Sequence, residues 1–337
     1  MRILILFDLY RPLGPGEDFS TAAELREAEK KTEADLLECL KRLGHDVTTL
    51  AVYDSVRTIF DKVDTFKPDV VFNVCESFHS NRSHEANIPA LLELMKVPYT
   101  GAGPDALMLC KDKALAKKLL TYHSVRVANF VVSQKDHPLR NLKRFKYPAF
   151  VKPLNEESSD GISKASFAKS EGEALERAKF IHEKLSTDAL VEEYIDGREL
   201  TVGVLGNSRL TVFPPQEIFF GEAPEGTPGE APRFATAKAK WDEGYRKKWG
   251  IRNGPADPLS PGVDAKLEKI ARRVYRVLQI RGLGRLDVRV TAAGEVVVIE
   301  ANPNPSLAKD DDFVQSAARG GIEYDALIQK VLENAVR

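Results

Sequence analysis

Polar and apolar residues alternate strictly along the segment 284–291, which reads GRLDVRVT. A period of two residues is typical of a β-strand with one buried face and one exposed face. A second run, rich in Val and Ile, covers residues 295–301, and the dipeptide Ala293-Gly294 between the two runs is typical of a tight turn. The pattern therefore predicts an antiparallel hairpin in this part of the chain.

The expected hairpin brings four polar side chains together. A two-residue turn sets Asp287 opposite Glu300 and Arg285 opposite Asn302, and side chains two residues apart share one face. Two carboxylates and an amide oxygen suit Mg²⁺, a hard cation that is often shared with phosphates. The alternative is a solvated strand face that carries a surface ion pair. Pro303 ends the strand after Asn302, and functional groups often lie at such ends.

The N-terminal part of the chain alternates between apolar runs and segments of helical spacing. Strands are expected at 2–8, 47–52 and 69–74, and helices at 22–43 and 86–95. This order predicts an α/β domain with a parallel sheet. The glycine-rich fingerprint of a Rossmann dinucleotide-binding unit is absent after the first strand, and the chain contains no Walker A sequence.

The rest of the chain mixes strands and helices. Its pattern predicts strands at 127–132, 147–151, 162–168, 190–195 and 199–205, and helices at 107–122, 171–185, 265–279, 311–318 and 324–335. Asp264 is expected to cap the helix that follows it. The lysines of the 107–122 helix are expected to form a solvated face. The Gly-, Pro- and Glu-rich segment 221–232 is expected to be mobile.

Lys152 closes the apolar run Ala149-Phe150-Val151 and precedes Pro153. A lysine that continues a buried strand needs an anionic partner, because an unpaired buried charge is costly. The small polar residues of 155–161 follow, and the hydroxyls and backbone N–H groups of such a loop can hold phosphates. An ordinary hairpin turn is the alternative for this loop.

Composition narrows the class of protein. The chain has 337 residues, enough for two or three domains, and 43% of them are hydrophobic and 29% charged. The formal net charge of −1 gives no electrostatic support for a nucleic-acid partner. The three cysteines lie far apart, and the chain shows neither a signal peptide nor a membrane-spanning run. A soluble cytoplasmic protein without a membrane partner is therefore expected.

In their order along the chain, these motifs resemble the ATP-grasp superfamily, and within it the D-alanine–D-alanine ligase-like carboxylate–amine ligases. The segments that carry the resemblance are Pro98-Tyr99-Thr100-Gly101, Asp112-Lys113, Val151-Lys152-Pro153 with Ser158-Ser159, Val191 to Ile195 with Gly197 and Glu199, Gly284 to Asp287, and Glu300-Ala301-Asn302. The resemblance implies an α/β ATP-grasp fold behind an N-terminal parallel α/β (pre-ATP-grasp) domain. The implied domains are 1–106, 107–190 and 191–337.

The resemblance also implies roles for individual residues. The phosphates of ATP would contact a set of lysines and a serine loop, namely Lys113, Lys152, Ser158, Ser159 and Lys240, with Lys238 as the alternative to Lys240. The adenine would be held by a strand made of Glu192, Glu193, Tyr194 and Ile195, and the ribose by Glu199. Mg²⁺, which Mn²⁺ can replace, would be held by Asp287, Glu300 and Asn302. The catalytic set would be Arg285, Lys240 and Ser158.

The implied chemistry is carboxylate–amine ligation. A substrate carboxylate attacks the γ-phosphorus of MgATP, and an amine then displaces phosphate from the acyl phosphate to give an amide, ADP and phosphate. Fixed lysines and Mg²⁺ would offset the charge on the transferring group, and Arg285 would stabilise the tetrahedral intermediate. Closure of the 153–161 loop would keep water from the acyl phosphate.

Four segments depart from the D-alanine ligase pattern. Glu17 in the first loop is out of register with the glutamate that normally holds the first substrate's ammonium. Val74-Cys75-Glu76-Ser77 replaces a His-Gly motif, and Ser83-His84-Glu85-Ala86 replaces a Gly-Glu-Asp-Gly segment. Asp311-Asp312 replaces the Ser-Leu pair that receives the second substrate's carboxylate.

An acidic pair at this position repels a carboxylate and suits an ammonium or guanidinium. The alternative is that these acids only complement a helix N-terminus. The hypothesis is thus a ligase with altered amino acid or amine substrates, bound with Glu76, Asp311 and Asp312. A cell-wall D-alanine–D-alanine ligase and a nucleotide-binding scaffold without turnover are the alternatives, and a homodimer is left open.

Overall fold

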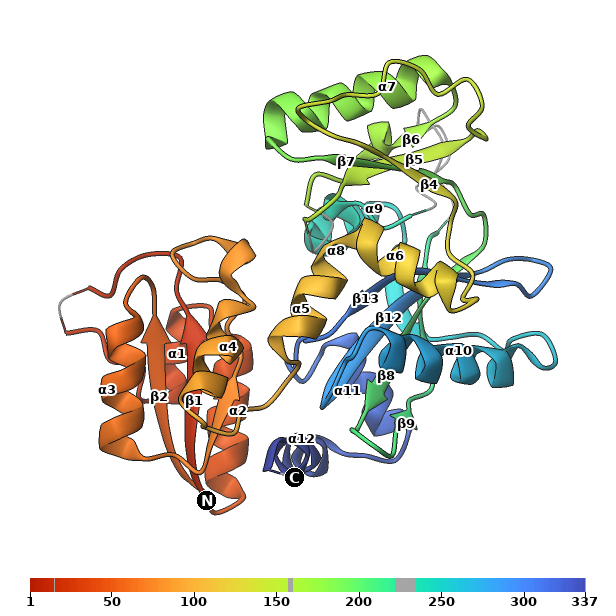
Figure 1. Cartoon of the computed structure of the whole chain (residues 1–337). Helices are drawn as coiled ribbons and strands as arrows, with labels where there is room; N and C mark the ends of the chain where they lie inside the picture. Colours follow the sequence, from red (N-terminus) through yellow and green to blue (C-terminus); the bar gives the residue numbers. More distant parts are fainter. Residues whose placement is uncertain (15, 157–159, 222–233, 337) are drawn as a thin grey trace.

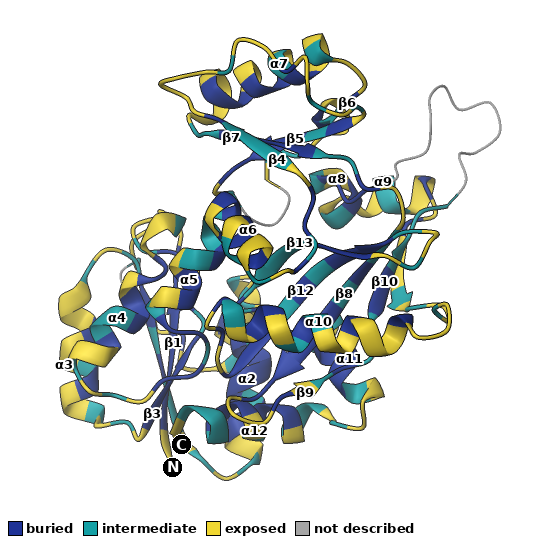
Figure 2. Cartoon of the chain, turned by 45° about the vertical axis from the view of Figure 1, so that its right-hand side comes forward, coloured by how far each residue is buried: buried dark blue, intermediate teal, exposed yellow. Residues whose placement is uncertain are grey.

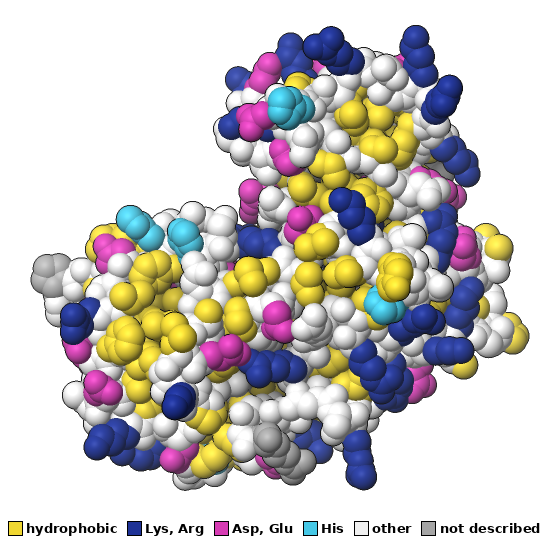
Figure 3. Space-filling model, in the orientation of Figure 1, with side chains coloured by type: hydrophobic (Ala, Val, Ile, Leu, Met, Phe, Trp, Pro, Cys, Tyr) yellow, Lys and Arg dark blue, Asp and Glu magenta, His cyan; other side chains and the backbone are white. Residues whose placement is uncertain are grey.

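The computed structural model describes residues 1–14, 16–156, 160–221 and 234–336. Three sheets follow one another along the chain, each with its own helices (Figure 1). The middle sheet and its helix stand out as a separate lobe in the space-filling view (Figure 3). The expected α/β fold with a parallel N-terminal sheet is confirmed, and the other two sheets are antiparallel.

The N-terminal sheet is parallel, with strand order β2-β1-β3. Its strands β1 (Arg2–Asp8), β2 (Asp46–Val52) and β3 (Val70–Asn73) lie where the pattern predicts them. Helix α4 (Asn87–Leu94) also matches, whereas α3 (Val56–Phe66) is an element that the sequence analysis does not predict. Alternate residues of β1 point into two separate hydrophobic clusters on opposite sides of the sheet.

The segment 22–43 forms two helices, so the expectation of a single helix is wrong. Helix α1 (Ala22–Glu27) ends where Glu29 adopts a left-handed conformation with φ of 59°, and α2 (Lys31–Arg42) follows. The N–H of Lys30 donates to the carbonyl of Leu25 at 2.8 Å and closes the first helix. Neither Gly nor Pro marks this break, so helical spacing could not predict it.

The expected helix 107–122 is likewise interrupted. Helix α5 (Pro104–Lys111) and helix α6 (Lys113–Tyr122) meet at Asp112. The Asp112 carboxylate accepts a hydrogen bond from the N–H of Leu115 at 2.9 Å, and such a side-chain cap begins a new helix. Helix α6 therefore has its own direction, and it passes close to the two following sheets.

The central sheet is antiparallel, with strand order β4-β7-β5-β6. Its strands are β4 (Phe130–Ser133), β5 (Ala149–Pro153), β6 (Phe167–Ala168) and β7 (Ala189–Glu193). Helix α7 (Glu171–Phe180) covers one face and continues as a π-helical turn, Ile181–Leu185. The strand expected at 162–168 is mostly wrong, because Ser163 and Ser166 cap a 3₁₀ turn there.

The C-terminal sheet is also antiparallel, with strand order β11-β10-β8-β12-β13 and β9 beside β8. Its strands are β8 (Arg198–Leu205), β9 (Thr211–Val212), β10 (Gln216–Phe219), β11 (Arg252–Pro255), β12 (Leu283–Val290) and β13 (Val296–Asn302). Its helices are α8 (Ala237–Trp241), α9 (Glu243–Lys248), α10 (Val263–Val277), α11 (Asp312–Arg319) and α12 (Tyr324–Val336). The sequence analysis does not predict β9, β10, β11, α8 or α9.

The helices α10 and α11 pack on opposite faces of this sheet. Leu200, Val202 and Val204 of β8 contact the α10 side, whereas Leu205 contacts the cluster that contains Phe313 of α11. Figure 2 shows that α10 buries the side facing the sheet and exposes its outer side. Asp264 does not cap this helix, because α10 begins at Val263 after Gly262 and Asp264 lies in its first turn.

The β12–β13 hairpin has the expected pairing for an unexpected reason. Asp287 pairs with Glu300 and Arg285 pairs with Asn302. The turn is longer than the expected two residues, because Thr291 N–H donates to the Glu295 carbonyl at 3.0 Å. A one-residue shift in register after Asp287 compensates for the extra turn residue.

The C-terminal helix completes the core of the N-terminal domain. Leu327 and Ile328 of α12 belong to the same cluster as Ile3 and Phe7 of β1. Arg42 also forms an ion pair with Asp325 at 2.5 Å. The first and last parts of the chain are therefore one packing unit. No helix in the described part of the chain is long and apolar enough to cross a membrane.

Candidate active site

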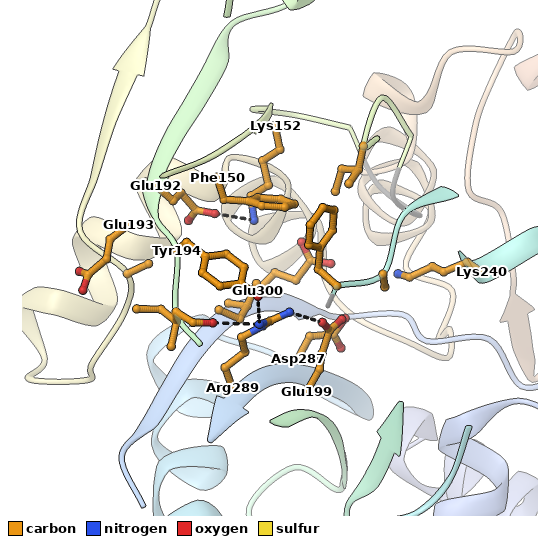
Figure 4. A pocket seen from close by; sticks show the side chains of 16 residues that line it. Phe150, Lys152, Glu192, Glu193, Tyr194, Glu199, Lys240, Asp287, Arg289 and Glu300 are labelled. Carbon is orange, nitrogen blue, oxygen red and sulfur yellow. Dashed lines mark hydrogen bonds and ion pairs between the residues drawn. The ribbon is translucent and has the colours of Figure 1, made fainter. Parts of the chain in front are cut away.

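A pocket lies between the central and C-terminal sheets (Figure 4). Strands β5 and β7 supply one wall, and β12 and β13 supply the other. Its described lining consists of Ala128, Phe150, Lys152, Ile162, Glu192, Glu193, Tyr194, Ile195, Glu199, Phe234, Ala235, Lys240, Asp287, Arg289, Ile299 and Glu300. Most of the residues expected to bind nucleotide or metal thus converge here from distant parts of the sequence.

Aromatic rings line one part of the pocket. The ring centroids of Phe150 and Phe234 lie 4.9 Å apart at an interplanar angle of 80°. Phe167 packs edge-on against Tyr194 with centroids 4.8 Å apart. A slot lined by rings and aliphatic groups suits a planar heteroaromatic base. Phe234 is not predicted from the sequence, because an isolated Phe after a Gly- and Pro-rich segment carries no local signal.

Arg289 ties the β7–β8 connection to β12. It donates to the Ile195 carbonyl at 2.9 Å, to the Tyr194 hydroxyl at 3.2 Å and to the Glu199 carboxylate at 2.8 Å. Glu199, expected to bind ribose, is therefore held in place by a buried guanidinium. Burial lowers the pKa of Arg289, but the Glu199 carboxylate opposes this effect, and the resulting pKa lies above the ordinary value. The guanidinium therefore stays charged. The sequence analysis missed this residue, although it continues the alternation of Arg285 and Asp287.

Glu192 is a buried counterion for two lysines. Its carboxylate lies 2.9 Å from Lys152 Nζ and 2.7 Å from Lys117 Nζ. The anionic partner expected for Lys152 is therefore present. Burial raises the pKa of Glu192, but the two ammonium groups outweigh burial and lower it. Lys117 corrects the expectation of a fully solvated lysine face on this helix, because only 2% of it is exposed.

The other residues of the β7 strand end have separate surroundings. The Glu193 carboxylate accepts from the Asn129 side chain at 2.7 Å and lies 3.4 Å from Arg126. Figure 4 shows it pointing away from the centre of the pocket.

Lys113, expected to contact phosphates, is buried and donates to the carbonyls of Leu154 and Glu156. It thereby anchors the start of the loop that was expected to cover the phosphates.

Asp287 and Glu300 are the carboxylates of the expected metal site. They face each other in the hairpin and both line the pocket. Burial raises the pKa of Glu300, but Lys113, Lys152, Lys240 and Arg285 lower it to about 2. Glu300 is therefore ionised at neutral pH.

Asn302, paired with Arg285, would supply the third oxygen ligand. Its amide oxygen accepts from the N–H of Asn304 at 2.9 Å, and a second lone pair remains for a cation. Among the described residues, no group of three or more His, Cys, Asp or Glu side chains is arranged as a metal site. Two carboxylates and one amide fit Mg²⁺, which completes its shell with water and phosphate oxygens.

Arg285 is surrounded by acids. It contacts both Asp287 oxygens, at 2.8 and 3.1 Å. Burial lowers its pKa, but Asp287, and then Asp311 and Asp312, raise it above its ordinary value. Asp311 caps α11 by accepting from the N–H of Asp312 at 2.9 Å, and the Asp312 carboxylate accepts from the Asn253 amide at 2.9 Å. Both readings of this acidic pair are therefore compatible with the geometry.

The remaining expected residues divide clearly. Lys240 lines the pocket, whereas Lys238 is exposed and is not part of the described lining. Lys240 is thus the better candidate for the third phosphate lysine. Ser158 and Ser159 lie outside the described residues, as does most of the 221–232 segment. Glu76 is exposed, lies 3.8 Å from Arg82 and lines a second cavity beside the N-terminal sheet.

Known proteins resemble the chain over most of its length. The family described as D-ala D-ala ligase C-terminus matches residues 111–333. A D-alanine–D-alanine ligase of Ruminiclostridium cellulolyticum is 30% identical over 331 residues, which cover 96% of this chain and 82% of that protein. An uncharacterized protein of Sinorhizobium fredii, y4sG, is 32% identical over 272 residues, which cover 80% of this chain and 75% of that protein.

The fold is also that of a solved ligase. The crystal structure of D-alanine–D-alanine ligase from Bacillus anthracis complexed with ATP aligns with a TM-score of 0.73 at 18% identity. The alignment covers 100% of this chain and 98% of that one. With the pocket geometry and the matched family, this identifies the chain as an ATP-grasp ligase that belongs to the D-alanine–D-alanine ligase family.

Proposed function

We propose that the protein joins a carboxylate to an amine through an acyl phosphate, at the expense of ATP and with Mg²⁺. The observation that carries the proposal is the pairing of Asp287 with Glu300 beside a base-sized aromatic slot. Lys152 and Lys240 line the same pocket. Phosphates bound there would lie close to these fixed cations and to the proposed metal ligands Asp287, Glu300 and Asn302, which together are called the metal face.

Each residue then has a distinct task. The aromatic slot and the strand end that Arg289 fixes would hold adenine, and Glu199 would hold the ribose. Bound by Asp287, Glu300 and Asn302, Mg²⁺ would neutralise phosphate charge. Lys113, Lys152 and Lys240 would add positive charge around the phosphates, and Ser158 and Ser159 remain proposed as donors from the covering loop. Lys152 stays protonated, because burial lowers its pKa but Glu192 raises it more.

The chemistry has two steps. A carboxylate oxygen of the first substrate bonds to the γ-phosphorus, and the bond from that phosphorus to the bridging oxygen breaks and releases ADP. An amine nitrogen then bonds to the acyl carbon, phosphate leaves with the electron pair of the C–O bond, and the nitrogen loses a proton. Arg285, close to the metal face, would stabilise the oxyanion of the tetrahedral intermediate.

The acceptor is proposed to be an amine without a carboxylate beside it. The N–H of Asp312, at the start of α11, already donates to Asp311. A substrate carboxylate would therefore meet two acids rather than free donors. Asp310, the third acid of this run, is bound to Lys31 at 2.7 Å and is less available.

A D-alanine–D-alanine ligase is the second candidate, because several relatives carry that name at 28–30% identity. A binding protein without turnover is the third, and the presence of Arg285 with the metal face argues against it. The cytoplasm is proposed as the compartment, since the three cysteines lie far apart in the sequence and form no CxxC pair. The proposed partners are small-molecule substrates, and self-association into a homodimer remains a proposal.

The test is release of ADP from MgATP with a panel of amino acids and amines, D-alanine included. Glu300→Gln is the control, because it keeps the shape of the side chain and removes the metal-binding charge. Turnover with a carboxylate–amine pair, lost in Glu300→Gln, supports ligation. Turnover with D-alanine alone would identify the second candidate, and ATP binding without any release would favour the third.

A further inference from the structure

Asn253 lies on β11, the edge strand of the C-terminal sheet, and connects an arginine to an acid. Its amide nitrogen donates to both carboxylate oxygens of Asp312, at 2.9 and 3.1 Å. Its amide oxygen accepts from the Arg246 guanidinium at 3.0 Å. Because a guanidinium only donates and an ionised carboxylate only accepts, this arrangement permits a single orientation of the amide. Asn253 is therefore a fixed donor toward Asp312.

Asp312 is close enough to Arg285 for the two charges to influence each other. Burial raises the pKa of Asp312, whereas the hydrogen bonds from Asn253 and the charge of Arg285 oppose this rise. Among the described contacts, Asp312 makes no hydrogen bond to Arg285, whose guanidinium is held by Asp287. An ionised carboxylate offers about four acceptor positions, and the amide of Asn253 occupies two. Asp312 can therefore accept from a further cation near the reaction centre.

Arg246 also holds a part of the nucleotide pocket. A second nitrogen of its guanidinium donates to the carbonyl of Ala239 at 2.6 Å. Ala239 is buried against Trp249 and directly precedes Lys240, which lines the pocket. One arginine thus connects the helix that carries the proposed phosphate lysine to the amide that holds Asp312.

We propose that Asn253 and Arg246 are positioning residues for the second substrate. Asn253 holds the Asp312 carboxylate in place to receive the cationic group of the acceptor amine. Arg246 fixes Asn253 and, through Ala239, the end of helix α8 that carries Lys240. The inference rests on the proposed ligation, and it makes the selection of a cationic acceptor depend on two residues that line neither of the two cavities.

The experiment compares Asn253→Leu, Arg246→Met, the double variant and the wild type, all as the full chain. The acceptors are agmatine, putrescine and the amides of the common amino acids, each varied at saturating MgATP with every acid of the amino acid panel. Lys247→Met is the matched control, because Lys247 follows Arg246 on α9 and is exposed.

Two further measurements separate the steps. Hydroxylamine traps an acyl phosphate as a hydroxamate, so the rate of hydroxamate formation reports the first step alone. Hydroxylamine is small and uncharged at neutral pH, and it therefore needs no carboxylate counterion. Calorimetry with a non-hydrolysable ATP analogue and Mg²⁺ measures binding of the acceptors without turnover.

The two single variants should differ in which substrate they affect. Asn253→Leu should raise the KM of the acceptor about ten- to a hundredfold, because hydrogen bonds to a charged group are lost. It should leave the KM of MgATP and the rate of hydroxamate formation unchanged. Arg246→Met should raise the KM of both the acceptor and MgATP about tenfold, because it releases both Asn253 and the carbonyl before Lys240.

The double variant tests whether the two residues act in series. Its acceptor KM should equal that of Asn253→Leu alone, because Arg246 acts on the acceptor only through Asn253. Additive effects on the acceptor KM would overturn the proposed connection. A fall in hydroxamate formation in Asn253→Leu that matches the change in acceptor KM would mean that Asn253 only supports the fold, which also overturns the inference.

The remaining outcomes distinguish this inference from the proposed ligation. Hydroxamate formation with an acceptor KM that Asn253→Leu leaves unchanged would overturn the role of Asn253 while ligation stands. Acceptor binding that depends on Asn253, without hydroxamate or ADP release from any acid, would support the acceptor site and overturn ligation. Neither acceptor binding nor turnover with any pair would overturn both.

Discussion

The Lys117 ammonium lies 2.7 Å from the Glu192 carboxylate, and both side chains are almost completely buried. Lys152 holds the other oxygen of Glu192 at 2.9 Å, and Lys117 also donates to the carbonyl of Ile299 at 3.0 Å. This cluster joins α6, the central sheet and the β12–β13 hairpin. It gives the floor of the pocket a fixed charge pattern before any ligand binds.

Lys117→Met should destabilise the protein by about 3 kcal/mol, because it leaves Glu192 buried with a single counterion. The loss should appear as a lower Tm in scanning calorimetry. Lys118→Met is the matched control, since Lys118 is the next residue of α6 and is exposed. Equal melting temperatures for the two variants would contradict a stabilising role for the cluster.

The Glu192 cluster should also respond to acid. The pKa of Glu192 is lowered in the folded protein. The stability that this carboxylate contributes is therefore fully present above its ordinary pKa of 4.5, and it is lost as the pH falls through the lowered pKa. The Tm difference between wild type and Glu192→Gln should therefore be constant from pH 7 to about pH 5 and shrink below that. A difference that grows on acidification would show that the carboxylate is protonated in the folded protein.

Arg289→Lys should weaken ATP binding about ten- to a hundredfold while leaving the overall charge unchanged. Lysine cannot reproduce the three directed hydrogen bonds to Tyr194, Ile195 and Glu199. Titration with a fluorescent ATP analogue measures the effect, with the exposed Arg276→Lys as control. An unchanged affinity for the ATP analogue would show that Arg289 plays no part in the proposed base binding.

Removal of divalent cations should abolish ADP release, because Asp287 and Glu300 are proposed to hold the Mg²⁺ that would offset the phosphate charge. Mg²⁺ and Mn²⁺ should restore turnover after chelation, whereas Ca²⁺, which prefers longer bonds and more ligands, should not. Activity that persists in excess chelator would rule out the proposed metal ligands.

The β12–β13 hairpin shows which structural features a sequence pattern can predict and which it cannot. The pairing of Asp287 with Glu300, predicted from a two-residue turn, is correct, yet the turn itself is longer than two residues. A longer turn and a bulge cancel, and neither has a clear local signal. The predicted pairing is correct because these two differences offset each other, whereas alternation by itself sets only which residues share a face of the strand.

Burial of individual lysines and arginines could not be predicted in the same way. Lys117 and Lys118 are adjacent and chemically identical, and only the docking of α6 against two sheets decides which one is buried. Arg289 continues the alternation of Arg285, but its role depends on a strand end almost a hundred residues earlier in the chain. Tertiary contacts, rather than propensity, assign these functions.

Asp311→Ser should change the preferred acceptor and leave stability nearly unchanged. Serine is as good an N-cap as aspartate, so α11 should keep its first turn. Loss of one acid near Arg285 should favour amines that carry a carboxylate, and the ratio of kcat/KM for such amines to that for simple amines should rise about tenfold. Asp310→Ser is the control, because Asp310 is bound to Lys31 at the surface. An unchanged ratio in Asp311→Ser would mean that Asp311 only caps the helix and plays no part in acceptor choice.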